Sequence, residues 1–196
     1  MRVRLVGLAL LTAVVGACAA PRDGARHEPA APATTVAGRA VAAREDQARF
    51  PPPGIVAVAE RRAAPALRLT AFDGRTVTLE DFRGRPAVVN FFESWCPTCA
   101  TEQPDLSRVA DEFARRVGFV GVSYHDTVAA GRAYQRRFEV PYPLANDASG
   151  RTWARWGVPY QPVTVLVDQQ GRIAERFDGG TTGGTLRAAL AYLVAE

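Results

Sequence analysis

The sequence contains no lysine, and all 24 of its Lys/Arg side chains are arginine. We attribute this bias to codon usage in a GC-rich genome. Residues 1–62 carry nine arginines and five acidic side chains, whereas residues 63–196 carry 15 of each. The part expected to fold is therefore neutral, and it lacks the surplus of positive charge that a phosphate-binding groove requires. We expect no nucleic-acid partner.

Metal-binding side chains are also scarce. The cysteines are Cys18, Cys96 and Cys99, and His125 is the one histidine after residue 62. A structural zinc site needs four ligands, so this set argues against zinc. We expect no bound metal and no cofactor. A copper carrier that uses Cys96, Cys99 and His125 stays open as an alternative, although such carriers usually space their cysteines more widely.

The apolar run nearest the N-terminus is too short to cross a bilayer. It covers 11 residues, Leu5–Val15, and a membrane span needs about 20. Two arginines precede the run and small residues follow it, which is the pattern of a secretory signal. Residues 15–18, VGAC, resemble a bacterial lipobox, which implies that residues 1–17 are a signal peptide and that Cys18 is lipidated. The alternative is ordinary cleavage nearby, with loss of Cys18.

Residues 18–62 are rich in Ala, Pro and Arg and include the run PPPG at 51–54. This composition buries too little apolar surface to offset the entropy lost on ordering. We therefore predict a flexible tether, with a span of about 35–40 Å, that joins a membrane anchor to one folded domain at 63–196.

The domain shows alternating strand and helix patterns. We predict a hairpin over 66–79, strands over 87–92, 118–124, 163–167 and 172–177, and helices over 97–116, 128–138, 151–156 and 182–194. Strands joined by helices should be parallel, because such crossovers are right-handed. The last two strands should form an antiparallel edge. These patterns predict one mixed α/β sheet with helices on both faces.

Cys96 and Cys99 are two residues apart and follow the apolar strand at 87–92. Cys96 should lie at the N-terminus of a helix, where free N–H groups and the helix dipole stabilise a thiolate. Pro97 suits the first helical position, and Cys99 lies one turn later, placed to attack a mixed disulfide. A purely structural disulfide is the alternative, but so short a loop gains little stability. The pattern favours a redox-active pair.

Residues 89–99, VNFFESWCPTC, resemble the TlpA/ResA-like branch of the thioredoxin family. FEVPYP at 138–143, WGV at 156–158 and QPVT at 161–164 match the same pattern. The resemblance covers about residues 65–194 and implies a thioredoxin fold with an N-terminal β-hairpin extension. It also implies an extracytoplasmic thiol–disulfide oxidoreductase, with a reductase of cytochrome c maturation type favoured over an oxidant of secreted proteins.

The resemblance assigns a role to the chain before the strand at 163–167. Pro162 should be a cis-proline that faces the cysteines. The backbone of Gln161 would then be free to pair with a substrate. Pro159 should be trans. The alternative for Pro162 is an ordinary trans proline at a strand start.

The resemblance also implies roles for residues around the pair. Pro97 and Thr98 shape the site between the cysteines, and Trp95 shields it unless it is a plain core aromatic. Glu102, one turn after Cys99, should tune proton transfer at the second thiol. The alternative is that Glu102 is solvated.

Two positions depart from the family pattern. Asn90 stands where thioredoxin proper has a buried carboxylate, and an amide cannot shuttle a proton. Glu93 stands where the branch usually has a small residue; either its charge raises the pKa values of the thiols or it points to solvent. The glycine-rich stretch at 179–184 lacks the lysine of a phosphate-binding loop and is expected to be a flexible turn into the last helix.

The partners implied by the resemblance are exported proteins that contain cysteine, a membrane thiol electron donor and, through Cys18, the membrane itself. We expect a monomer. A non-catalytic binding module with the same fold is an alternative. A peroxidase of the peroxiredoxin type is a lesser one, because the T-x-x-C pattern usual in that branch is absent.

Overall fold

The computed structural model describes residues 54–196. The expected signal peptide at 1–17, Cys18 and most of the expected tether at 18–62 lie outside these residues. In the described part, no helix is long and apolar enough to cross a membrane.

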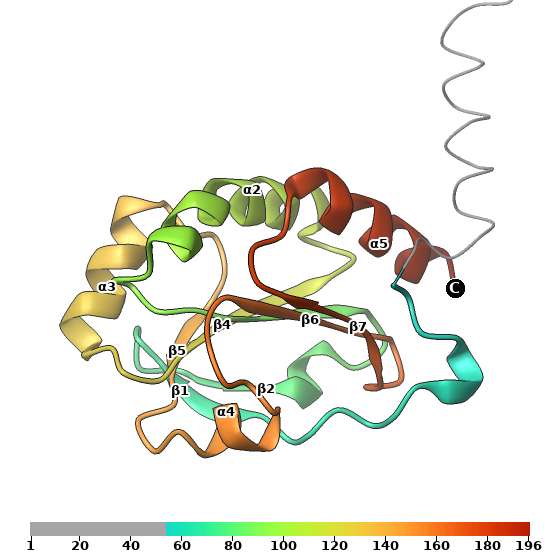
Figure 1. Cartoon of the computed structure of the whole chain (residues 1–196), viewed down its shortest axis with the longest axis horizontal. Coiled ribbons are helices and arrows are strands. Elements are labelled where there is room, and N and C mark those ends of the chain that lie inside the picture. Colours follow the sequence, from blue (N-terminus) through green and yellow to red (C-terminus); the bar gives the residue numbers. More distant parts are fainter. Residues whose placement is uncertain (1–53) are drawn as a thin grey trace, which may run out of the picture. The chain divides into compact units, whose positions relative to one another are not determined.

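A seven-stranded sheet in the order β2-β1-β5-β4-β3-β6-β7 forms the centre of the domain (Figure 1). Its strands are β1 (Arg68–Ala71), β2 (Thr76–Thr78), β3 (Ala87–Phe91), β4 (Gly118–Ser123), β5 (Leu144–Asn146), β6 (Val163–Val167) and β7 (Ile173–Asp178). Strands β3, β4 and β5 are parallel, whereas β6 is antiparallel to both β3 and β7. The mixed sheet and its antiparallel edge confirm the predicted fold class.

Helices cover both faces of the sheet. The helices are α2 (Pro97–Phe113), α3 (Val128–Arg137), α4 (Arg151–Arg155) and α5 (Gly183–Ala195), with 3-10 turns η1 (Val58–Glu60) and η2 (Leu79–Phe82). Figure 1 shows α2, α3 and α5 on one side of the sheet and α4 on the other. Side chains alternate along β3, so Val88 packs into the core under α2 while Val89 packs into the core on the α4 side. Both faces of β3 are buried, as its continuous apolar run predicts.

Strand β5 was not predicted. It has only three residues and pairs in parallel with β4, with Gly121 opposite Leu144. It also pairs antiparallel with β1, with Thr70 opposite Asn146. A three-residue strand is too short to show a periodicity, so its existence depends on these long-range partners. Through β5, the predicted N-terminal hairpin joins the main sheet.

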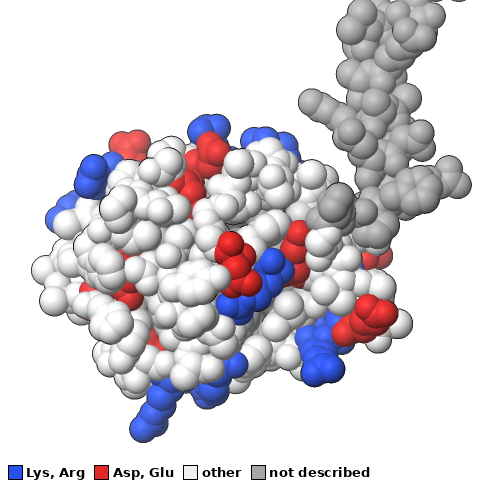
Figure 2. Space-filling model, in the orientation of Figure 1, with Lys and Arg blue, Asp and Glu red and all other residues white. Residues whose placement is uncertain are grey.

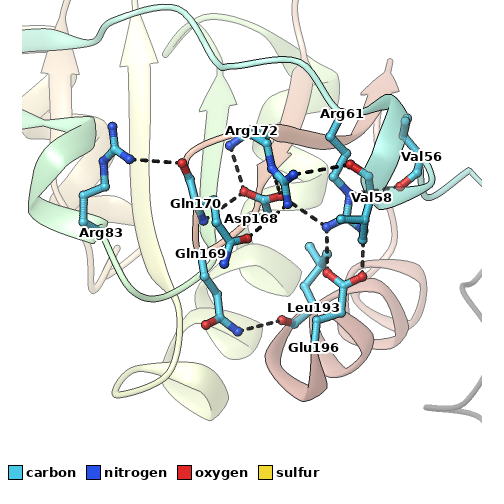
Figure 3. Close-up of polar contacts among 10 residues, drawn as sticks. All are labelled: Val56, Val58, Arg61, Arg83, Asp168, Gln169, Gln170, Arg172, Leu193 and Glu196. Carbon is cyan, nitrogen blue, oxygen red and sulfur yellow. Dashed lines mark hydrogen bonds and ion pairs between the residues drawn. The ribbon is translucent and has the colours of Figure 1, made fainter.

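The chain before the hairpin packs along β7 and the end of α5. The N–H of Val56 donates to the carbonyl of Ala174 at 2.8 Å. The guanidinium of Arg61 is buried and contacts Asp168 at 3.3 Å and the side chain of Glu196 at 2.7 Å (Figure 3). The boundary expected at residue 63 stays a prediction, and these contacts show that residues just before it pack against the domain.

On the face shown in Figure 2, arginine and acidic side chains are interspersed over the described residues. Several of these charges are paired, as in the contact of Arg187 with Glu112 at 2.6 Å. This distribution agrees with the equal numbers of arginine and acidic residues after residue 62.

Candidate active site

Cys96 and Cys99 form a disulfide where the chain passes from β3 into α2, with their Cα atoms 5.3 Å apart. Cys96 is the N-cap of α2, and its Sγ accepts a hydrogen bond from the N–H of Cys99 at 3.1 Å. Pro97 occupies the start of the helix, where its missing N–H costs nothing. The sulfur of Cys96 therefore lies among free N–H groups at the positive end of the helix dipole, which favours a thiolate after reduction.

The segment before β6 leads into the strand position that pairs with the end of β3. The Gln161–Pro162 peptide bond is cis, the isomer expected from the resemblance, and it is the only cis bond among the described residues, so Pro159 is trans. Val163 pairs with Phe91, near the end of β3, which brings Pro162 close to the start of α2. Gln161 is half-buried.

Glu102 is buried, with an exposed fraction of 5%. The alternative that this glutamate is solvated is therefore wrong. One carboxylate oxygen accepts a hydrogen bond from the side-chain amide of Asn90 at 3.1 Å, and the other accepts from the N–H of Thr181 at 3.0 Å. Burial raises the pKa of Glu102 above its usual value, and the two hydrogen bonds partly oppose this rise. Glu102 thus binds a proton more tightly than an exposed glutamate does.

The glycine-rich stretch at 179–184 leads into α5 as expected, but it also contacts α2. A Cβ on Gly180 would lie 3.2 Å from the methyl group of Thr98 and 3.5 Å from Oε2 of Glu102. The N–H of Gly183 donates to Asp105 at 2.8 Å. The sequence pattern did not predict this wall of the site. The only signal for it was the run of glycines, which allows close approach of a backbone.

Two aromatic side chains next to the cysteine and cis-proline motifs are exposed. Trp95, next to Cys96, is 60% exposed, so the alternative that it is a core aromatic is wrong. Tyr160, two residues before Pro162, is 50% exposed, and the sequence analysis did not single it out. Trp and Tyr side chains are enriched at interfaces, because each combines a large apolar ring with a polar group.

Glu93 is fully buried, so the alternative that it points to solvent is wrong. Its carboxylate accepts hydrogen bonds from the hydroxyl of Ser123 at 3.1 Å and from the N–H groups of Tyr124 at 3.0 Å and His125 at 2.9 Å. These bonds fasten the chain just before Cys96 to the loop that follows β4. The N–H of Cys96 in turn donates to the carbonyl of Glu93 at 3.1 Å.

His125 does not complete a metal-binding group with the cysteines. Its ring nitrogen Nδ1 lies 3.5 Å from Glu93, and 61% of its side chain is exposed. Within residues 54–196, no three His, Cys, Asp or Glu side chains are grouped so that they could hold a metal ion. The donor set that the copper alternative requires is therefore not assembled in this structure.

A disulfide at the start of a helix, with a cis-proline just before the strand that pairs with β3, defines a thiol–disulfide oxidoreductase. Residues 61–176 match the AhpC/TSA family, and the chain belongs to that family. Relatives include the thiol:disulfide interchange protein DsbE of Pseudomonas aeruginosa, 36% identical over 62% of this chain and 67% of that protein. The thiol-disulfide oxidoreductase ResA of Bacillus thuringiensis is 25% identical over 62% of this chain and 70% of its own length.

Solved structures of disulfide oxidoreductases also match this chain. A secreted disulfide oxidoreductase of Mycobacterium tuberculosis, described as homologous to E. coli DsbE, superposes with a TM-score of 0.59 at 30% identity. The match covers 65% of this chain and 96% of that one. A DsbF homologue from Corynebacterium diphtheriae superposes with a TM-score of 0.63 at 25% identity, over 70% of this chain and 93% of that one. These matches confirm the thioredoxin-type fold and the predicted family.

Proposed function

We propose that this protein is an extracytoplasmic reductase that passes electrons from a membrane thiol donor to disulfides in exported proteins. The haem-site cysteines of apocytochrome c are the favoured substrate. The observation that carries the proposal is the Cys96–Cys99 disulfide at the start of α2 with the buried carboxyl of Glu102 one turn beyond Cys99. The similarity to DsbE and ResA supports the same class of chemistry.

The proposed reaction begins with the reduced pair. The thiolate of Cys96 attacks a substrate disulfide, forming a mixed disulfide and releasing one substrate sulfur as a thiolate. Cys99 then gives its proton to Glu102 and attacks the sulfur of Cys96. The bond to the substrate breaks, the second substrate sulfur leaves as a thiolate, and the Cys96–Cys99 disulfide forms. Two electrons reach the substrate, and a donor dithiol restores the pair by the same exchange.

We assign substrate binding to the loops around the disulfide. The cis bond at Pro162 leaves the backbone of Gln161 available to pair with an extended polypeptide. Trp95, next to Cys96, and Tyr160, two residues before Pro162, offer exposed aromatic surface. Pro97 and Thr98 lie between the two cysteines. An extended segment of an exported protein, with a cysteine near its centre, fits this arrangement.

The proposed location rests on the N-terminal sequence. We infer that the signal at 1–17 is removed, that Cys18 is lipidated, and that residues 18–62 hold a monomeric domain at the outer face of the membrane. A lipoprotein cysteine carries several acyl chains, and each buried methylene contributes about 0.8 kcal/mol, so such an anchor is stable. The soluble secreted antigen MPT53 of Mycobacterium tuberculosis, 36% identical over 61% of this chain, supports an exported location.

The reduction potential of the pair distinguishes a reductase from an oxidant. We would measure it against glutathione buffers in the full chain carrying Cys18→Ser, so that only Cys96 and Cys99 titrate. The proposal predicts a value near or below that of thioredoxin, about −270 mV. A value near that of DsbA, about −120 mV, would instead assign an oxidant of secreted proteins. The absence of any reversible dithiol titration would reject both and favour a binding module.

A further inference from the structure

A chain of buried hydrogen bonds links β6, β3 and the β7–α5 loop to the carboxylate of Glu102. Asn90 on β3 lies opposite Thr164 on β6, and both side chains are buried. The Asn90 amide nitrogen donates both of its hydrogens, one to the hydroxyl of Thr164 at 3.0 Å and one to Glu102 at 3.1 Å. The N–H of Thr181 supplies the remaining hydrogen bond to the carboxylate at 3.0 Å.

No arginine or histidine pairs with this carboxylate among the described residues. Its negative charge therefore depends on two uncharged donors, the amide of Asn90 and the N–H of Thr181. A carboxylate that loses one of two such donors in a buried site becomes harder to ionise. A side-chain substitution can remove the donor of Asn90, whereas the donor of Thr181 belongs to the backbone.

We propose that Asn90 is a positioning residue that holds the Glu102 carboxylate, oriented and ionised, where it accepts the proton of Cys99. The inference rests on the proposed reductase function and deepens it. Asn90 shuttles no proton itself. In the resolving step, the Cys99 proton moves to Glu102, the bond between Cys99 and Cys96 forms, and the substrate sulfur leaves with the electron pair. When a donor dithiol reduces the pair again, Glu102 returns the proton to Cys99.

Other titratable groups near Glu102 keep the same charge throughout this step. Tyr134 on α3 and Tyr142, just before β5, interact with its charge, and burial raises the pKa of each phenol well above its ordinary value. Both are therefore neutral across the range in which a carboxyl and a thiol titrate. Asp105, one turn further along α2, is held by the N–H of Gly183, which keeps its pKa below the usual value.

The test uses the full chain carrying Cys18→Ser and compares it with the same chain carrying Asn90→Ala. In the oxidised state the cysteines do not titrate, so the ¹³C signal of the Glu102 carboxyl, assigned with Glu102→Gln, reports its protonation directly. We expect Asn90→Ala to raise the titration midpoint by about one pH unit, a tenfold change in the ionised fraction. The low-pH limb of the rate of oxidised glutathione reduction should move by the same amount.

Two further variants separate positioning from a general structural effect. Thr164→Val removes the other partner of Asn90 but keeps its bond to Glu102, and should leave the midpoint unchanged. Adding Asn90→Ala to Glu102→Gln should not shift the rate profile further. If Asn90→Ala weakens folding too much, Asn90→Leu fills the space without a donor and has the same expected shift.

The inference is overturned by an unmoved Glu102 midpoint, by an equal shift in Thr164→Val, or by a rate loss that is the same at every pH. Failure of the proposed function has a different signature. In that case the chain with Asn90 intact does not reduce oxidised glutathione at any pH, while the carboxyl titration still reports on Asn90.

Discussion

Glu175 on β7 is a buried carboxyl group without a counter-charge among the described residues. It is 4% exposed, and its Oε2 has no hydrogen-bond partner within residues 54–196. The backbone near Gly54 lies directly over the carboxyl, since a Cβ on Gly54 would overlap Oε1 of Glu175. Burial raises the pKa of Glu175 from 4.5 to about 7.

This raised pKa makes Glu175 a source of pH-dependent instability. The native state binds its proton more tightly than the unfolded chain does, so the free energy of unfolding falls as pH rises from 4.5 to about 7. Each pKa unit corresponds to about 1.4 kcal/mol. Between about pH 5 and about pH 8, the protein should lose about 2–3 kcal/mol through this group alone.

Urea unfolding of the full chain across this pH range, with and without Glu175→Gln, measures the effect. The variant keeps the shape of the side chain but cannot ionise. Over this pH range its free energy of unfolding should therefore fall by about 2–3 kcal/mol less than that of the parent chain. Glu112→Gln is the matched control, because Glu112 is 44% exposed, and its curve should parallel that of the parent chain. Parallel curves for Glu175→Gln as well would refute the assignment of a raised pKa to a buried, unpaired carboxyl.

Two other substitutions test contacts that hold the domain together. Arg61→Ala should lower the free energy of unfolding by about 3 kcal/mol, because it leaves the buried Asp168 without one of its two cations. Arg172→Ala, which removes the more exposed cation, should cost clearly less, and equal losses would contradict this ranking. Glu93→Ala should cost at least about 2 kcal/mol in the same assay, because it removes the buried acceptor of three hydrogen bonds. A loss of less than about 0.5 kcal/mol, typical of a surface site, would contradict this expectation.

The parts of the fold that follow from local pattern were predictable. Strands β3, β4 and β6 are mostly apolar because both of their faces are buried. Pro97 marked the start of α2, and Thr182 caps α5 as expected. Strand β5 was not predictable in this way, because its three residues are defined by pairing with β1 and β4.

The site residues also separate into those that a local pattern predicts and those that depend on long-range contacts. The redox-active Cys96–Cys99 pair follows from a short motif that carries its own chemistry, whereas the cis bond at Pro162 was expected from the family resemblance alone. The burial of Glu93 follows from neither, since its partners are about 30 residues away and a glutamate taken alone favours solvent. The contact of Thr181 with Glu102 spans a still longer separation, and no local pattern reports it.

Trapping the mixed disulfide tests the central claim most directly. Full chains carrying Cys18→Ser with either Cys99→Ser or Cys96→Ser would be mixed with a synthetic peptide that contains one intramolecular C-x-x-C disulfide, and the products weighed by mass spectrometry without reductant. With Cys96 as the nucleophile at the start of α2, the Cys99→Ser chain should accumulate a covalent adduct with the peptide, and the Cys96→Ser chain should not. Equal trapping by both chains, or trapping by neither, would contradict the assignment of Cys96 as the attacking thiol.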